Sequence, residues 1–430
     1  MAHFALICPP YYSHLQVFAV LGAELVRRGH RVTFVVNAGA GTLLAAKTSA
    51  GIAIREAGEG GPDRLAAIIA RAARPNGPLG ILRTVSDAAG LTDELCRIAP
   101  DILREIGATA IVGDQMEPAA GLVADHLGLP FVSVAAALPV HADPTVPLPF
   151  LGWPYDPSDK GLKRNRGGEC VANLLMTSQR RNIAGWAARF GLAQRATLAD
   201  CLSPRAQISQ LVPGFDFPRA ADPHRHAVGP IRPPDDGPPS LPAGLDDRLD
   251  PDRPLVFASL GTLQGHRAGI FRAVAGACRD LGAQCVVAHC GRLDGRQAAR
   301  IDADIVTDFL PQRAMLSRAA ICVTHAGMNT VLDCLEAGVP MLAVPIAFDQ
   351  PGIAARIVHH GVGERLPRVL LSRARIRNSL ERLLTTPSFR EAAQRIGRDI
   401  RESSGTMRAT DIIEDVICGT RAGLVGESSI

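Results

Sequence analysis

The chain contains two series of short apolar runs, each followed by a turn and an amphipathic stretch, and this alternation limits the possible fold more than any other feature. The first 36 residues show the pattern as HFALIC, the turn PPYYSH, an amphipathic stretch ending in LVRRGH, and RVTFVV. Gly29 follows two arginines, as is typical of the end of a helix. A strand, a helix and a second strand in this order predict a parallel βαβ unit.

Similar units follow on both sides of a proline-rich segment. ATAIVGD, EPAAGLVADHLG and LPFVSVAA continue the first series, and PLVFASLG, QCVVAHCG, DIVTDFLP, AAICVTHAG and VPMLAVPI belong to the second. Residues 217–254 between them are dense in proline, glycine and aspartate and lack a periodic pattern. With 430 residues, the chain is long enough for two cores. We therefore predict an α/β protein with two doubly wound parallel-sheet domains, at 1–216 and 255–406, joined by a linker at 217–254.

The C-terminal segment and the composition add further expectations. Residues 407–430 contain the amphipathic stretch MRATDIIEDVIC with no strand after it, so we expect a helix that packs back on the first domain, followed by a tail. The net charge is only +4 without a basic cluster, which argues against a nucleic-acid partner. The ten cysteines show no metal-binding spacing and are expected to be reduced thiols in a cytoplasmic protein. Neither a signal peptide nor a membrane-spanning run is expected.

Four polar turns follow strands of the second series. They are SLGT at 259–262, FLPQ at 309–312, THAGMNT at 324–330 and AFDQPG at 347–352. The carboxyl ends of parallel strands meet at one edge of a sheet, where helix N-termini present free N–H groups to anions. The four turns therefore predict one ligand site at this edge of the second sheet.

The turn at 324–330 carries the residue types that a nucleoside diphosphate requires. Gly327 lets an anion approach the backbone, Thr330 supplies a hydroxyl, and His325 can donate a hydrogen bond to a phosphate oxygen. Asn329 and Asp333 lie four residues apart on one helical face, with Asp333 placed to accept from ribose hydroxyls. Each residue taken singly is more simply a helix cap or a turn residue. The convergence of four such turns favours the binding site.

The ordered motifs PQ, HxGxNT, D, GVP and DQP resemble the donor-binding signature of the UDP-glycosyltransferase superfamily, whose GT-B fold has two Rossmann-like domains facing across a cleft. The resemblance implies an enzyme that uses UDP-glucose as donor substrate, with no cofactor and no bound metal. It implies donor-binding roles for Ser259, Thr262, Phe309, Gln312, His325, Gly327, Asn329, Thr330, Asp333, Asp349 and Gln350. Many relatives have tryptophan at the position of Phe309, so the surface for stacking a base is smaller here, and the case for uracil over thymine is weaker.

The family's catalytic base is a histidine after the first strand, and the resemblance implies His14 for this role. A helix N-terminus disfavours imidazolium, so we expect His14 to be neutral and able to accept a proton in an inverting transfer. Asp114, at the end of AIVGD, can reach the same crevice and fix the tautomer of the ring, and Glu117 is a weaker alternative. A helix cap at His14 and a helix start at Asp114 are equally simple interpretations.

The acceptor site is less well indicated. Met116, Pro118, Leu138, Pro139 and the loop PTVPLPFLGWPY, with Phe150 and Trp153, form an apolar set that suits a large lipophilic alcohol, although core and loop packing explains each residue equally well.

Longer stretches, among them DQMEPAAGLVADHLGLPFVSVA, LSPRAQISQLVPGFDFPR and AFDQPGIAARIVHHG, resemble the bacterial zeaxanthin glucosyltransferases. This resemblance implies glucosylation of the ring hydroxyls of zeaxanthin, to mono- and diglucosides, by an enzyme attached peripherally to the cytoplasmic membrane face. A macrolide or polyketide glycosyltransferase and a non-catalytic nucleotide-sugar binding module are the alternatives.

Overall fold

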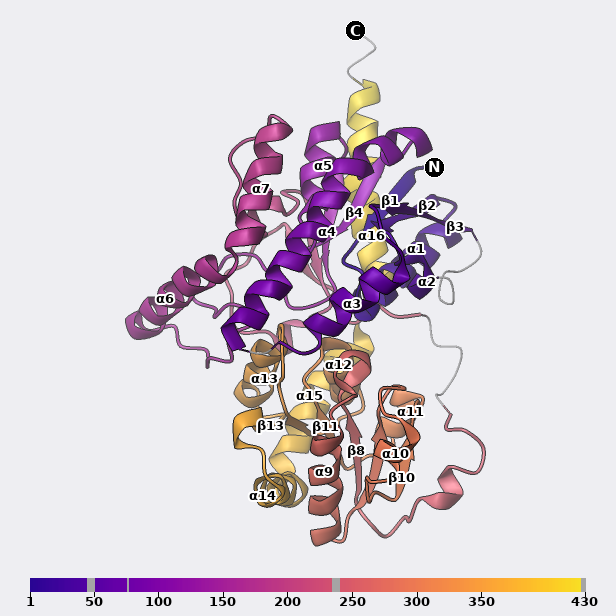
Figure 1. Cartoon of the computed structure of the whole chain (residues 1–430), viewed down its shortest axis with the longest axis vertical. Coiled ribbons are helices and arrows are strands. Elements are labelled where there is room, and N and C mark those ends of the chain that lie inside the picture. The colour runs from indigo at the N-terminus through magenta and orange to yellow at the C-terminus, as the bar shows by residue number, and fades with distance from the viewer. Residues whose placement is uncertain (45–50, 76, 234–239, 427–430) are drawn as a thin grey trace.

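The structure is a computed structural model that describes residues 1–44, 51–75, 77–233 and 240–426, with side chains up to residue 419. Two parallel sheets form the centres of two stacked domains (Figure 1). Helices surround both sheets, as repeated βαβ units require. The predicted fold class is confirmed.

The first sheet has the strand order β3-β2-β1-β4-β5-β6-β7, and all its pairings are parallel. Its strands are β1 (His3–Ile7), β2 (Arg31–Asn37), β3 (Ile52–Ala57), β4 (Ala110–Asp114), β5 (Phe131–Ala135), β6 (Gln207–Ser209) and β7 (Arg225–Ala227). Around it lie α1 (Tyr12–Arg27), α2 (Gly41–Leu44), α3 (Pro62–Ala72), α4 (Gly77–Ile106), α5 (Ala119–Leu127), α6 (Asp159–Leu175) and α7 (Thr177–Arg189), with short 3-10 turns at Ala199–Cys201 and Pro213–Phe215.

The second sheet has the order β10-β9-β8-β11-β12-β13 and is also parallel throughout. Its strands are β8 (Leu255–Ser259), β9 (Gln284–Ala288), β10 (Ile305–Thr307), β11 (Ile321–Thr324), β12 (Met341–Ala343) and β13 (Gly363–Arg365). The helices of this half are α8 (Gly261–Gln264), α9 (Ala268–Asp280), α10 (Gly295–Ala298), α11 (Gln312–Leu316), α12 (Met328–Glu336), α13 (Gln350–His359), α14 (Arg373–Thr385) and α15 (Pro387–Glu402), with 3-10 turns at Asp246–Arg248 and Arg368–Leu370.

The first domain extends beyond the boundary predicted at residue 216. Strand β7 lies inside the predicted linker, yet it pairs in parallel with β6 at the edge of the first sheet. Its sequence, RHA, is too short and too polar to show a strand pattern, and pairing with β6 rather than hydrophobic periodicity holds it in place. Residues 234–239 of the predicted linker and 427–430 of the predicted tail lie outside the described residues.

The chain crosses between the domains at two neighbouring places. After β7 it passes through Gly229 into the second half, and after α15 it returns through Gly405 into α16 (Gly405–Gly426). The backbone N–H of Arg232 donates to the hydroxyl of Thr406 at 3.0 Å, and that hydroxyl donates to the carbonyl oxygen of Arg232 at 2.7 Å. A Cβ added at Gly229 would lie 2.1 Å from the Ser403 hydroxyl. The two crossings are therefore packed directly against each other.

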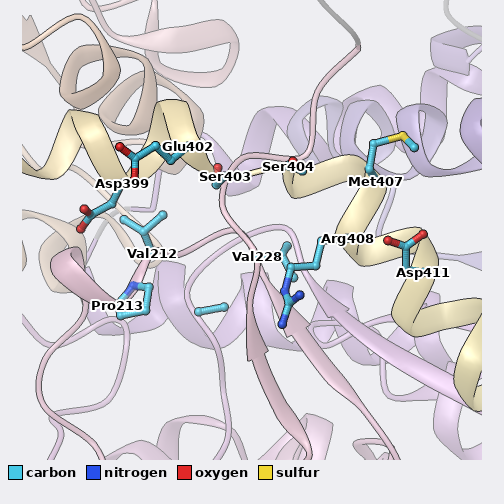
Figure 2. A pocket seen from close by; sticks show the side chains of 11 residues that line it. Val212, Pro213, Val228, Asp399, Glu402, Ser403, Ser404, Met407, Arg408 and Asp411 are labelled. Atoms are coloured by element: carbon cyan, nitrogen blue, oxygen red, sulfur yellow. The ribbon is translucent and has the colours of Figure 1, made fainter.

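A groove lies beside these crossings, between the end of β6, the chain after β7 and the junction of α15 with α16. Figure 2 shows the side chains that line it, from Val212, Pro213, Val228, Asp399, Glu402, Ser403, Ser404, Met407, Arg408 and Asp411. None of the residues predicted to bind donor or acceptor lines this groove. The groove therefore lies at the junction of the two domains and not at the predicted donor or acceptor site.

Candidate functional site

The first domain brings His14 and Asp114 together at the point where the strand order of its sheet reverses. Strand β1 pairs with β2 on one side and β4 on the other, so the carboxyl ends of β1 and β4 border the crevice of a doubly wound sheet. His14 lies in the first turn of α1, directly after β1, and Asp114 ends β4. The imidazole Nδ1 lies 2.7 Å from the Asp114 Oδ2. The other carboxylate oxygen of Asp114 accepts from the backbone N–H of Met116 at 2.8 Å.

The pKa of His14 is shifted by its neighbours in a direction that the helix N-terminus alone does not explain. Burial acts to lower the pKa of His14, but the charge of Asp114, its hydrogen bond and the charge of Asp349 together raise this pKa above its ordinary value. A carboxylate in direct contact therefore outweighs the helix dipole in setting the direction of the pKa shift, and a neutral His14 that accepts a proton stays a prediction.

Glu117 does not contact the imidazole. Its Oε1 accepts from the Thr92 hydroxyl at 2.9 Å and from the Ala119 N–H at 3.1 Å, and burial raises the pKa of Glu117 to about 7. Asp114, rather than Glu117, is therefore the carboxylate that contacts His14.

The second sheet reverses its order between β8 and β11, and His325 lies at that point. Its ring is held between two glycines: an added Cβ at Gly261 would lie 2.7 Å from His325 Cε1, and one at Gly327 would lie 2.5 Å from Nε2. Burial lowers the pKa of His325 to about 4, so the imidazole is neutral near pH 7. Its Nδ1 is buried without a hydrogen-bond partner among the described residues.

Among the residues that the structure describes, three other than glycine have left-handed backbone angles, and all three follow strands of the second sheet. They are Cys290 (φ 57°) after β9, Ala326 (φ 66°) after β11 and Phe348 (φ 56°) after β12. Such conformations cost about 1–3 kcal/mol each and gather at ligand sites. These strained residues therefore lie at the same edge of the second sheet as the four polar turns, although backbone angles played no part in selecting those turns.

A network of polar side chains joins α11 to α12. The Gln312 amide donates to Asp333 Oδ2 at 2.7 Å, and the Thr330 hydroxyl donates to the Gln312 Oε1 at 3.1 Å. Arg232, from the first crossing between the domains, donates to Asp333 Oδ1 at 3.1 Å and to Glu336 Oε2 at 2.9 Å. Burial raises the pKa of Asp333, against the opposing effect of the Gln312 hydrogen bond and the Arg232 charge. The Asp333 carboxylate is thus oriented through both oxygens.

The remaining donor-site candidates lie on the same edge of the sheet. Ser259 ends β8, and its hydroxyl accepts from the Gly261 N–H at 3.4 Å. Thr262 follows in α8, and its carbonyl oxygen accepts from Arg292 at 2.6 Å. Phe309 is 64% exposed beyond β10, which leaves its ring free to stack. Asn329 Oδ1 accepts from Gln210 of the first domain at 3.3 Å.

The turn at 347–352 contacts the first domain. The Asp349 Oδ2 accepts from the Leu138 N–H at 3.0 Å, and Tyr11 and Phe348 have ring centroids 6.0 Å apart. Burial raises the pKa of Asp349, whereas the Leu138 N–H and His14 act to lower it. Gln350 instead caps its own turn, because its Oε1 accepts from the N–H groups of Ile346 and Ala347, both at 2.9 Å. Residues of the two domains therefore meet around His14.

The candidate acceptor residues divide by exposure. Met116 and Phe150 are exposed, Trp153 is half-buried, and Pro118, Leu138 and Pro139 are buried. Leu138 packs in a core cluster of the second domain. Its side chain therefore contributes to contact between the domains rather than to an open pocket wall.

No cluster of three or more histidine, cysteine or acidic side chains suited to a metal ion occurs in the described ranges. The sequence DAD at residues 302–304 has two aspartates, and both are ion-paired, Asp302 with Arg279 and Asp304 with Arg253. Within the same ranges, no helix is long and apolar enough to cross a bilayer.

Known proteins resemble the chain over most of its length. Residues 174–402 match the family described as UDP-glucoronosyl and UDP-glucosyl transferase. A zeaxanthin glucosyltransferase from Pantoea ananas is 43% identical over 99% of this chain and 98% of its own. The chain belongs to the UDP-glycosyltransferase family. A second zeaxanthin glucosyltransferase, from Pseudescherichia vulneris, is 39% identical over 98% of this chain and 100% of its own.

Solved structures agree with a UDP-glycosyltransferase at the level of the fold. The calicheamicin glycosyltransferase CalG4 superimposes with a TM-score of 0.72 and 24% identity, over 98% of this chain and 99% of that one. The glycotransferase of kitacinnamycin gives a TM-score of 0.74 and 20% identity, over 97% and 99%. The two parallel-sheet domains of this UDP-glycosyltransferase thus have the GT-B arrangement.

Sequence reasoning missed two residues that contact the predicted donor-binding residues of this UDP-glycosyltransferase. Those predicted residues lie at the carboxyl edge of the second sheet, which we call the donor edge. Arg232 lies in the proline-rich segment, where an arginine carries no recognisable pattern. Gln210 is buried just after β6, where its Nε2 donates to the Ala136 carbonyl at 3.1 Å and its Oε1 accepts from the Ile231 N–H at 3.0 Å. A buried glutamine after a strand was the one available signal, because buried amides need partners.

Proposed function

We propose that the protein is an inverting glucosyltransferase that transfers glucose from UDP-glucose to the ring hydroxyls of zeaxanthin, giving mono- and diglucosides. The supporting observation is similarity along nearly the whole chain, at 43% and 39% identity, to two zeaxanthin glucosyltransferases. Similarity of this extent includes both the donor domain and the domain that carries the acceptor site.

His14 is the proposed base. Its Nδ1–H donates to Asp114, which leaves the lone pair of Nε2 as the proton acceptor. As Nε2 takes the proton of an acceptor hydroxyl, that oxygen attacks the anomeric carbon, and the bond from this carbon to the diphosphate oxygen breaks. UDP leaves with the bonding electrons, and the configuration at the anomeric carbon inverts. Asp114 stabilises the imidazolium that forms.

The donor edge is proposed to hold UDP-glucose through the residues described above. His325, Gly327, Asn329 and Thr330 at the N-terminus of α12, with Ser259 and Thr262, would receive the diphosphate and its developing charge. Phe309 and Gln312 would contact the base and Asp333 the ribose. Asp349 would meet the sugar hydroxyls, and Gln350 would support that turn through its own backbone contacts.

We propose that this reaction needs no separate cofactor. The chain supplies a base in His14 and charge stabilisation at a helix N-terminus, which are the two elements that the transfer requires. The expected outcome is that exhaustive dialysis against a chelator leaves turnover unchanged, as measured by UDP release.

The acceptor would enter beside Met116 and Phe150, which are exposed and follow closely after Asp114 and Pro149 in the chain. A long hydroxylated carotenoid resides in a bilayer, so we propose that the enzyme works at the cytoplasmic membrane face as a peripheral protein.

The deciding experiment crosses UDP-glucose and dTDP-glucose with zeaxanthin and a macrolide. We expect zeaxanthin mono- and diglucosides from UDP-glucose, with inverted anomeric configuration by NMR. Glucosylation of the macrolide alone would instead favour the antibiotic-type activity. His14→Ala should lower kcat by about 10²- to 10⁴-fold with little change in UDP affinity. Unchanged turnover in this variant would refute the role of His14, and wild-type UDP binding without any turnover would favour a non-catalytic binding module.

A further inference from the structure

Helix α6 projects from the first domain and covers little of it (Figure 1). It belongs to the long excursion between β5 and β6, and its buried side is a narrow stripe of Gly161, Asn165, Gly168 and Ala172. Helix α6 has 17 residues, and because its buried residues are small it gains little stability from packing. The residues on its outer side therefore call for a separate explanation.

Toward its N-terminus the outer side of α6 carries more basic than acidic side chains, with Asp159 as the exposed acid of its first turn. Lys160, Lys163 and Arg166 are exposed and form no hydrogen bond or ion pair with the described part of the chain. The whole sequence has three lysines, and two of them are in this helix. Lysine has a long apolar stem and a mobile charged end, which suits contact with an interface between oil and water better than a fixed ion pair.

The same side becomes apolar toward the C-terminus. Val171 is 60% exposed and Leu174 is 72% exposed. Lys160, Lys163, Val171 and Leu174 follow one another at spacings of three, eight and three residues, which places all four on one helical face that points away from the buried stripe. Helix α4 contacts α6 and adds three exposed apolar side chains in its first turns, Leu79, Ile81 and Leu82.

This surface is connected to the proposed acceptor entrance. Arg164 lies over the Trp153 ring at 5.3 Å and donates to the Pro154 carbonyl oxygen at 2.8 Å. The same loop, at Pro149, accepts a hydrogen bond from the Gly352 N–H across the cleft at 3.0 Å. The loop that α6 supports is thus the one that borders the site.

We propose that this docking surface, made of Lys160, Lys163, Arg166, Val171 and Leu174 of α6 with Leu79 and Leu82 of α4, binds the anionic surface of a lipid bilayer. Basic side chains meet anionic headgroups while the adjacent apolar side chains enter the interface. The inference rests on the proposed function in so far as a bilayer is where a carotenoid acceptor resides. Docking there places the acceptor loop against the membrane, so the acceptor can move from lipid to cleft without crossing water.

Co-sedimentation of the full chain with vesicles tests the docking surface directly. Vesicles of phosphatidylcholine containing phosphatidylglycerol are compared with pure phosphatidylcholine, at low and high salt. We expect binding to the anionic vesicles, at least tenfold weaker at high salt and on the zwitterionic vesicles. The variant K160E/K163E/R166E should lose binding at least tenfold, and V171S/L174S should weaken it severalfold. R300E/R395E/R398E makes the same change in net charge at exposed arginines of the second domain and should bind as the wild type does.

Turnover separates docking from the proposed function. Zeaxanthin is supplied either in detergent micelles or within anionic vesicles. The charge-reversed α6 variant should match the wild type in micelles, which also shows that it is folded, and be at least tenfold slower with vesicles. Failure of the wild type to bind anionic vesicles, or equal loss in the matched control, overturns the docking surface. Vesicle binding that depends on α6, without glucosylation in either form, would leave docking supported and the proposed acceptor wrong.

Discussion

The pair formed by His14 and Asp114 makes a prediction about pH. A protonated His14 cannot accept a proton, so turnover should rise with pH through its pKa. Burial lowers that pKa and Asp114 raises it, with a net raised value. Asp114→Asn removes the charge and leaves burial, so the acid limb of kcat/KM should move to lower pH while the plateau falls about 10²-fold or more.

The measurement is a pH–rate profile for both proteins. Asp125→Asn is the matched control, because Asp125 pairs with Arg195 on the surface of the same domain. Its acid limb should coincide with that of the wild type. An acid limb that stays in place in Asp114→Asn would contradict the assignment of Asp114 as the group that raises the pKa of His14.

The glycines around His325 give a second prediction at this scale. Gly327 has an ordinary backbone conformation (φ −72°), so alanine there adds no backbone strain, but its Cβ would lie 2.5 Å from His325 Nε2. The ring must move, at a cost of about 1–3 kcal/mol, so Gly327→Ala should weaken UDP binding about tenfold or more. Isothermal titration calorimetry measures this. Gly185→Ala in α7, where an added Cβ meets nothing within 4 Å, should bind UDP normally.

At the residue scale, the sequence was informative where a motif combines spacing with an unusual residue type. His325 and Gly327 lie on the predicted edge, and His14 lies beside Asp114, because each follows the carboxyl end of a parallel strand. The shifted pKa of His14 and the capping role of Gln350 could not be read in this way. Both depend on atoms brought together from distant parts of the chain.

At the scale of elements, α12 is held in place by an arginine from outside its own domain. Arg232 contacts Asp333 and Glu336 on successive turns of this helix, and these groups are only partly exposed. Arg232→Met should free the Asp333 carboxylate and cost about 1–2 kcal/mol, after allowance for solvent screening. We expect the KM for UDP-glucose to rise about 5- to 30-fold with kcat little changed.

Steady-state kinetics with varied UDP-glucose give that separation of KM from kcat. Arg318→Met removes an exposed ion pair with Asp246 in the same half of the chain and should leave both constants unchanged. A fall in kcat at unchanged KM would mean that Arg232 acts on the chemical step rather than on donor binding.

The elements themselves were predictable where hydrophobic periodicity is strong. β1, β4, β8 and β11 are entirely buried and coincide with the apolar runs of the sequence. β7 was not predictable, because RHA is an edge strand held by pairing rather than by burial. Strand β5 ends at Ala135 and its neighbour β6 begins only at Gln207. The long segment between them contains α6 and α7.

At the scale of the whole molecule, α16 ties the end of the chain to its beginning. Its Ala409, Ile413 and Ile417 belong to the core cluster of the first sheet, and its Glu414 pairs with Arg28 and with His30 at 2.7 Å. Burial acts to raise the pKa of Glu414, but the His30 and Arg28 hydrogen bonds outweigh it and lower that pKa. The C-terminal helix is therefore part of the first domain, although the whole segment from Leu255 to Glu402, which forms the second domain, lies between β7 and this helix in the sequence.

The stability of the first domain should depend on this helix. Ile413→Ala removes a fully buried side chain from the packing between α16 and α1, at a cost of about 2–5 kcal/mol. We expect a clear fall in the Tm of the first domain, followed by calorimetry, because this contact joins the two ends of the chain rather than neighbouring elements. Asp415→Ala, on the exposed side of the same helix, should change stability by less than about 0.5 kcal/mol. If Ile413→Ala unfolds at the wild-type temperature, α16 does not serve as a structural part of the first domain, and the two crossings beside Arg232 and Thr406 would be left to hold the domains together.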